Sequence, residues 1–183
     1  MEMTMSEPGL SSRIGFRLMA AMMSLTRKGP RLEERVRASS VEPGQVILDY
    51  GCGPGHYTIP AARIVGPGGR VYALDIQPAA AGMVGERARA AGLDNVTTVV
   101  SERDTGLASG SVDMVLLYDS IAGISDKQGV LAELDRVLKP SGVLSVWVEH
   151  GDPVDTLPLV TENSDFIMRE RDGDILNFTR PTG

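Results

Sequence analysis

Five short apolar or β-branched runs recur between residues 46 and 148, separated by segments with the composition of helices and turns. The runs cover residues 46–48, 71–74, 96–100, 112–117 and 143–148. Strands that are apolar on both faces belong to a parallel sheet covered by helices on each side. The alternation therefore predicts an α/β fold with a doubly wound, mostly parallel sheet.

Helical patterns fill most of the gaps between these runs. Residues 58–65 and 77–91 are predicted helices, each followed by glycine, which commonly ends a helix. A third predicted helix follows Ser125, which forms a capping box with Gln128, and ends at the Lys-Pro-Ser-Gly segment 139–142. These helices supply the connections that parallel strands require.

The pattern changes after the fifth run. A short helix is predicted near residues 154–160, and two strand-like runs follow at 166–171 and 174–180. The dipeptide Asp172-Gly173 stands between the two runs, and Asp-Gly is typical of a tight hairpin turn. The sheet is therefore predicted to end in a C-terminal antiparallel hairpin.

A length of 183 residues fits a single domain. Residues 46–183 are predicted to form its core, and residues 1–45 a helical segment that precedes the first strand. Between Ile14 and Leu25 this segment has an apolar, methionine-rich helical face. Such a face either packs on the sheet or acts as a lid over a binding site, and the sequence leaves both interpretations open.

Composition disfavours several classes of partner. The formal net charge of −6 disfavours a broad phosphate-binding surface, so nucleic acid is not an expected partner. The apolar stretch 18–25 is too short for a membrane span. The single cysteine, Cys52, suits a reducing compartment and predicts a cytoplasmic protein, and the few Cys and His residues predict no metal site. The sequence does not specify the oligomeric state.

The most informative segment is ILDYGCGPG, residues 47–55. Its glycines, Gly51, Gly53 and Gly55, follow the first strand and allow the backbone to approach a ligand closely, and the next helix offers its N–H groups. A dinucleotide-binding turn has different glycine spacing. Here Asp49 belongs to the motif, and a carboxylate there would repel a pyrophosphate but suits a cationic ligand.

A second acidic residue ends the second strand. Asp75 closes the segment VYALD and lies 20 residues after Gly55. A carboxylate at this position can accept hydrogen bonds from both hydroxyls of a ribose. The alternative is a helix N-cap, because Pro78 and an alanine-rich helix follow. The glycine turn upstream favours the ribose interpretation, and one carboxylate can serve both purposes.

Together these segments resemble a class I S-adenosylmethionine-dependent methyltransferase. The resemblance is carried by ILDYGCGPG, VYALDI, SVDMVLLYD and VLKPSGVLSV, and it extends from about Val46 to Arg180. It implies a Rossmann-like, seven-stranded sheet with one hairpin strand inserted antiparallel. It also implies S-adenosylmethionine as cofactor and a small molecule as the methyl acceptor.

The resemblance further implies roles for individual residues. Asp49, Gly51 and Gly53 would surround the methionine part of the cofactor, Asp75 would bind the ribose and Ile76 would pack on the adenine. The expected cofactor-binding set is Asp49, Gly51, Cys52, Gly53, Gly55, Asp75, Ile76, Glu102, Arg103 and Tyr118.

The adenine amino group is expected to meet an acid just after the third strand. Glu102 occupies that position, Arg103 is the neighbouring backbone position, and Asp104 is a competing candidate. Cys52, within the glycine turn, is interpreted as a small packed residue rather than a nucleophile, because the spacing implies no histidine partner.

Two residues are candidates for catalysis. Tyr118 ends the fourth strand, and the resemblance implies that a residue at this position faces the methyl group of the cofactor. Alternatively, its ring simply closes the sheet edge. His150 follows the fifth strand at the carboxyl edge and could take a proton from an acceptor, or it is a polar surface residue. Ala122 stands where several similar methyltransferases have a histidine.

The predicted function is methyl transfer from S-adenosylmethionine to a small-molecule acceptor, driven mainly by positioning. One alternative is a protein that binds S-adenosylmethionine or S-adenosylhomocysteine without turnover. The absence of a histidine at Ala122 keeps this alternative open. Another is an NAD-dependent oxidoreductase, which the glycine spacing and Asp49 disfavour. The sequence does not identify the acceptor atom.

Overall fold

The computed structural model describes residues 30–149 and 152–181. The apolar face between residues 14 and 25, with the predicted lid, lies outside the described residues, and so does His150. Within the described part, no helix is long and apolar enough to cross a membrane.

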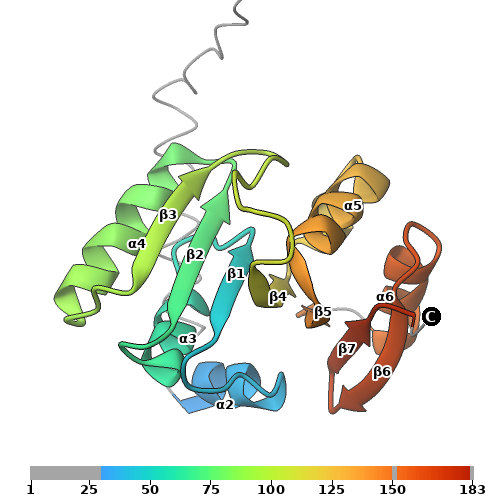
Figure 1. The fold of residues 1–183 in the computed structure, drawn as a ribbon, viewed down its shortest axis with the longest axis horizontal. Coiled ribbons are helices and arrows are strands. Elements are labelled where there is room, and N and C mark those ends of the chain that lie inside the picture. Colours follow the sequence, from blue (N-terminus) through green and yellow to red (C-terminus); the bar gives the residue numbers. More distant parts are fainter. Residues whose placement is uncertain (1–29, 150–151, 182–183) are drawn as a thin grey trace, which may run out of the picture.

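The described strands form one seven-stranded sheet in the order β3-β2-β1-β4-β5-β7-β6 (Figure 1). The strands are β1 (Val46–Tyr50), β2 (Arg70–Asp75), β3 (Val96–Val100), β4 (Val112–Tyr118), β5 (Leu138–Trp147), β6 (Ile167–Asp172) and β7 (Ile175–Thr179). The first five run parallel, whereas β7 is antiparallel to both β5 and β6. This confirms the predicted doubly wound sheet and its C-terminal hairpin.

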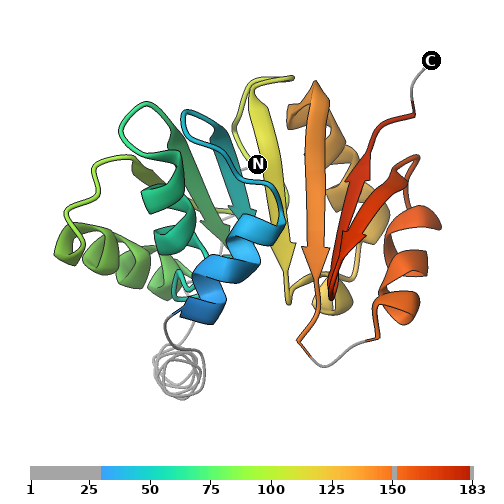
Figure 2. The same ribbon diagram turned by 90° about the horizontal axis from the view of Figure 1, so that it is seen from below.

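Helices cover both faces of the sheet, with α2 and α3 on the face opposite α5 (Figure 2). The described helices are α2 (Pro30–Ala38), α3 (Thr58–Val65), α4 (Pro78–Ala90), α5 (Lys127–Val137) and α6 (Pro153–Thr161). One detail of the predicted helix starts is wrong. The N-cap of α5 is Asp126, whose side chain accepts a hydrogen bond from Gly129 N at 2.9 Å, and not Ser125. The segment 139–142, predicted to end this helix, belongs to β5.

Alternation along the central strands builds two cores. Ile47 and Leu116 pack on the side of α2 and α3, whereas Leu48 and Leu117 pack on the side of α5 and α6, and all four are fully buried. Successive side chains of a strand point to opposite faces, so β1 and β4 must be apolar at nearly every position. The edge strand β3 differs, because Val100 is 45% exposed.

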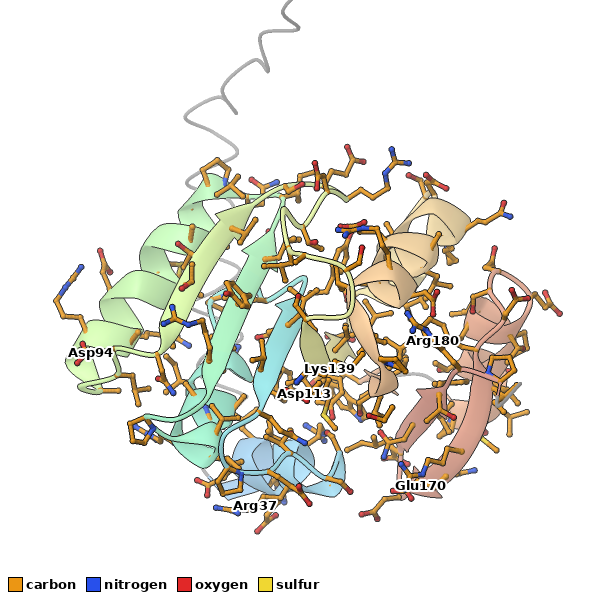
Figure 3. All side chains as sticks on the ribbon, viewed as in Figure 1. Arg37, Asp94, Asp113, Lys139, Glu170 and Arg180 are labelled. Carbon is orange, nitrogen blue, oxygen red and sulfur yellow. The ribbon has the colours of Figure 1, made fainter. Side chains whose placement is uncertain are left out.

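A partly exposed link at the amino end of the sheet holds three strands together. Asp113 accepts a hydrogen bond from Val46 N at 2.8 Å and from Lys139 Nζ at 2.6 Å, and it thereby joins β4 to the starts of β1 and β5. Figure 3 labels Asp113 and Lys139 side by side near the middle of the molecule. The link lies at the sheet edge opposite the strands' carboxyl ends.

Replacing Asp113 with alanine is expected to destabilise the fold. The substitution leaves the N–H of Val46 and the ammonium of Lys139 without this acceptor, and because both groups are partly exposed to water the expected loss is about 0.5–1.5 kcal/mol. Urea unfolding would show a lower midpoint, and Asp113→Asn, which keeps an acceptor for Val46 N, should lose less. Equal midpoints for the wild type and the alanine variant would contradict this role.

The sheet order also determines where a ligand can bind. From β1 the chain proceeds to β2 on one side, and β4 lies on the other side of β1. Helices that leave neighbouring strands in opposite directions open a crevice at the carboxyl ends of those strands. The candidate site is therefore expected beyond the ends of β1, β2 and β4.

Candidate functional site

A cavity of about 810 Å³ lies at this edge of the sheet. Its walls come from the ends of β1 and β2, the chain after β3, the turn after β4 and the start of α5. The lining residues are Tyr50, Gly51, Leu74, Asp75, Ile76, Ser101, Glu102, Arg103, Asp119, Ser120, Gly123, Ile124, Ser125, Asp126 and Val130. Five of the ten residues predicted to bind the cofactor are in this set: Gly51, Asp75, Ile76, Glu102 and Arg103.

The glycine turn reaches the cavity through Gly51. The backbone N–H groups of Gly51 and Cys52 both donate to Leu74 O, at 2.8 and 2.9 Å, which fixes the turn against the end of β2. Gly51 has a φ of +74°, and a Cβ on it would lie 2.7 Å from the Cβ of Ser120. Any side chain here would be strained and would also push into the turn after β4.

Asp75 connects the glycine turn to the start of α4. One carboxylate oxygen accepts from Gly53 N and the other from Gln77 N, each at 2.8 Å. The N-cap of α4 is Gln77, so the alternative that Asp75 is the N-cap residue is wrong. Each carboxylate oxygen can accept more than one hydrogen bond, so Asp75 retains acceptor capacity toward the cavity that it lines.

Asp49 lies beneath the turn and is not among the cavity-lining residues. It is only 2% exposed, and its carboxylate accepts a hydrogen bond from Thr58 Oγ1 at 2.5 Å. Burial and, to a smaller extent, the nearby charge of Asp75 raise the pKa of Asp49 to about 7, against the lowering effect of the hydrogen bond from Thr58. Asp49 can therefore influence a ligand in the cavity through its negative charge and through the position of the glycine turn, without contacting it.

Three other members of the motif shape the turn. Cys52 is buried, and burial raises the pKa of its thiol, which agrees with its interpretation as a packed residue. Gly55 has a φ of +83°, and a Cβ on it would lie 2.9 Å from Val84 Cγ2 of α4. Gly53 donates its N–H to Asp75. None of the three is among the lining residues.

The far end of the cavity is formed by Ile76 and the chain after β3. Ile76 is 49% exposed, which leaves a large apolar surface uncovered beside the cavity. Glu102 and Arg103 line the cavity, whereas Asp104 accepts from Gly106 N at 3.0 Å and is not a lining residue. Of the two acids considered in the sequence, Glu102 is therefore the one placed at the cavity.

The Tyr118 side chain lies apart from the cavity-lining residues. Its ring is buried on the α2 side of the sheet, and its hydroxyl is hydrogen-bonded to Ser39 Oγ and, at 3.2 Å, to Ser145 Oγ. The ring meets Tyr57 edge-on with centroids 4.9 Å apart. The side chain is not among the cavity-lining residues, and its role as a cofactor contact or a catalytic residue stays a prediction. The alternative, a ring that closes the sheet edge, describes what the structure contains.

Sequence reasoning missed the wall residues Tyr50 and Ser120. Tyr50 lines the cavity, its hydroxyl donates to Glu102 O, and burial followed by the charge of Glu102 raises its pKa to about 12. Ser120 donates to Tyr50 O at 3.2 Å. Asp119 accepts from Glu149 N and has a φ of +59°, a region that residues other than glycine rarely adopt. The place of Tyr50 at the end of β1 and of Ser120 shortly after β4 was the available signal.

The cavity carries an excess of acidic side chains. Asp75, Glu102, Asp119 and Asp126 line it, and Arg103 is the only basic residue among the lining residues. A cationic ligand is therefore favoured over an anionic one. Among the described residues, no group of three or more His, Cys, Asp or Glu side chains is placed to hold a metal ion.

Comparisons with known proteins point to one family. A family model described as "Methyltransferase domain" matches residues 41–172. A demethylmenaquinone methyltransferase from Geobacillus stearothermophilus is 30% identical over 136 residues, which are 74% of this chain and 58% of that protein. The aklanonic acid methyltransferase DauC from Streptomyces sp. (strain C5) is 36% identical over 121 residues, 64% of this chain and 52% of that protein. The chain thus spans little more than half the length of these relatives.

Solved structures share the fold. A SAM-dependent methyltransferase from Aquifex aeolicus superposes with a TM-score of 0.72 at 24% identity, covering 87% of this chain and 97% of that one. The [4+2]-cyclase SpnF superposes with a TM-score of 0.65 at 22% identity, covering 76% of this chain and 57% of that one. The same architecture thus occurs in proteins named for different reactions, and function must be argued from the site.

Proposed function

Since this chain belongs to the methyltransferase domain family, we propose that it binds S-adenosylmethionine in the cavity described above and transfers a methyl group to a small-molecule acceptor. The observation that carries the proposal is Asp75. Its carboxylate lies in the cavity at the end of β2, tied to the glycine turn through Gly53 N. A carboxylate in that place suits the two hydroxyls of a ribose.

The residues around the cavity fit this cofactor in three respects. Asp75 offers acceptors for the ribose, and the exposed apolar surface of Ile76 offers a packing face for the adenine. The excess of acidic side chains suits the sulfonium and ammonium charges at the other end. When bound, S-adenosylmethionine supplies an electrophilic methyl group on its sulfonium.

The contribution of the chain is positioning. In-line displacement requires the donor and the acceptor to be held at near-attack distance with water excluded. Gly51 allows the backbone to come close to the bound ligand, and the turn containing Asp119 and Ser120 forms the facing wall. His150, outside the described residues, stays a prediction as the group that accepts the proton of the acceptor.

The finer statements about this function are inferred from the sequence and its relatives. A small-molecule acceptor is supported by relatives named as demethylmenaquinone and aklanonic acid methyltransferases. The net charge of −6 supports an acceptor other than nucleic acid. A cytoplasmic location rests on the single cysteine, Cys52.

Calorimetric titration of the full chain tests the cofactor assignment. We expect S-adenosylhomocysteine to bind and NAD not to bind, because Asp49 and the glycine spacing oppose a pyrophosphate. Binding of NAD in place of S-adenosylhomocysteine would overturn the proposal. The second candidate function is binding without turnover, which we consider because a cyclase shares the fold. Release of S-adenosylhomocysteine during incubation with S-adenosylmethionine and acceptor candidates distinguishes turnover from binding alone.

A further inference from the structure

The chain between β3 and β4 forms one wall of the cavity without any regular structure of its own. Residues 101–110, here called the β3–β4 loop, are all described and contain no helix or strand. The loop carries Glu102 and Arg103 into the cavity. Figure 1 shows it bending from the end of β3 toward α5 before the chain enters β4. Its conformation must therefore be set by contacts with other elements.

The middle of the loop is held by Glu133 of α5. Glu133 Oε1 accepts hydrogen bonds from Thr105 N at 3.0 Å and from Thr105 Oγ1 at 2.6 Å. Thr105 is only 2% exposed, and its Oγ1 in turn accepts from Leu107 N at 3.2 Å. Buried polar groups require partners, and a carboxylate is a strong acceptor for them. Glu133 thus satisfies the donors around which the loop turns.

Arg136 holds this carboxylate in place and also reaches the loop itself. Its Nε donates to Glu133 Oε2 at 2.7 Å, and its Nη2 donates to Glu133 Oε1 at 2.8 Å and to Leu107 O at 2.9 Å. Its Nη1 donates to Ser109 Oγ at 3.0 Å. Arg136, together with the hydrogen bonds from Thr105, lowers the pKa of Glu133 to about 2, so the carboxylate stays ionised at any ordinary pH. The pair acts as one rigid support.

Both ends of the loop are attached to the same helix. Near its start, Arg103 Nη1 lies 3.1 Å from Asp126 Oδ2, the N-cap of α5. At its end, Gly110 N donates to Arg136 O at 3.0 Å. The loop is therefore fixed to α5 near its start, in its middle and at its end. The exposed Arg103–Asp126 pair contributes little by itself, whereas the largely buried Glu133 contacts contribute more.

We propose that Glu133 is a positioning residue for base recognition: by anchoring the β3–β4 loop it holds Glu102 and Arg103 against the adenine of the cofactor. This inference rests on the proposed function, because it takes the occupant of the cavity to be an adenosyl compound. Glu133 itself is not a cavity-lining residue and acts through the loop.

Two nucleoside ligands test the proposal on the full chain. S-adenosylhomocysteine carries the adenine amino group, and S-inosylhomocysteine has a carbonyl in its place. The wild type should bind the adenosyl compound more tightly. Glu133→Ala should reduce the ratio of the two dissociation constants by roughly fivefold or more, because the loop no longer holds Glu102 in its position beside the base. A purely structural role would change stability and leave the ratio of the two dissociation constants unchanged.

A matched control comes from the same helix. Asp135 lies two residues from Glu133, but its Oδ1 pairs with Arg180 Nε at 2.6 Å. Figure 3 labels Arg180 between α5 and the C-terminal hairpin. Asp135→Ala should lower stability without changing the ratio. Hydrogen exchange should show faster exchange at Thr105 and Leu107 in Glu133→Ala and not in Asp135→Ala. Should Glu133→Ala fail to fold, Glu133→Gln, which loses the ion pair but keeps an acceptor, should show the same changes at smaller size.

The outcomes separate the inference from the proposed function. A ratio that stays within about twofold of wild type in folded Glu133 variants would overturn the inference alone. A wild type that binds the two compounds equally would do the same. A wild type that binds neither compound would refute the proposed function, and the base-recognition role with it.

Discussion

Replacing Asp75 with alanine is expected to raise the dissociation constant for S-adenosylhomocysteine by roughly tenfold or more. Two hydrogen bonds from ribose hydroxyls to a carboxylate are lost, each worth about 1.5–3 kcal/mol. The substitution also leaves Gly53 N and Gln77 N without their acceptor, so the glycine turn itself loosens. Titration calorimetry of the wild type and the variant measures the change directly.

Two variants serve as controls for this experiment. Asp75→Asn keeps the size of the side chain and one good acceptor, and it should fall between the wild type and the alanine variant. Asp113→Ala lowers stability at the opposite edge of the sheet, and it should leave the dissociation constant unchanged. Normal binding by Asp75→Ala would remove the main support for the proposed cofactor site.

The second large effect concerns the pH dependence of stability at Asp49. The pKa of Asp49 is about 7 in the folded protein and ordinarily 3.8, so the folded state binds the proton more tightly than the unfolded state. Stability from this group is therefore present in full at acidic pH and declines as pH rises from about 4 through 7. The full shift corresponds to roughly 4 kcal/mol.

Asp49→Asn isolates this contribution. Asparagine cannot ionise, and its carbonyl can still accept from Thr58 Oγ1, so the variant should gain stability relative to wild type as pH rises. Urea unfolding of both proteins at about pH 5 and about pH 8 should show a difference of a few kcal/mol between the two conditions. A difference that does not change with pH would contradict the raised pKa.

The same residue predicts how ligand affinity depends on pH. A cationic ligand favours the ionised form of Asp49, so binding at low pH must first remove a proton. The wild type should bind S-adenosylmethionine more tightly as pH rises through 7, and Asp49→Asn should lose that dependence. S-adenosylhomocysteine, which lacks the sulfonium charge, should show a weaker dependence.

Much of the fold was predictable because its signals are local. A strand buried on both faces must be apolar at almost every position, so β1 and β4 are visible as continuous runs, and the Asp172-Gly173 turn marks the hairpin. The motif in residues 47–55 and the acid at Asp75 likewise predicted where the cavity lies. Each is recognised from the spacing of a few neighbouring residues and from its place at the end of a strand.

Tyr118 shows what such signals cannot decide. When both faces of a strand are buried, an apolar run does not reveal which face each residue occupies, and a shift of one position exchanges the faces. The register of β4 against β1 and β5 puts the Tyr118 ring beside Ser39 and Ser145, on the side away from the cavity. Likewise, β3 has the composition of a buried strand, but its edge position leaves Val100 exposed.

The sequence by itself thus determined the alternation of elements, the glycine turn and the acids at two strand ends, because each depends on residues close together in the chain. Tertiary structure decided which residues share the cavity and which side chains support it. Glu133 and Thr105 are 28 residues apart, and no local pattern links them. They meet because the order of the strands lays the β3–β4 loop along α5, and only the packed sheet fixes that order.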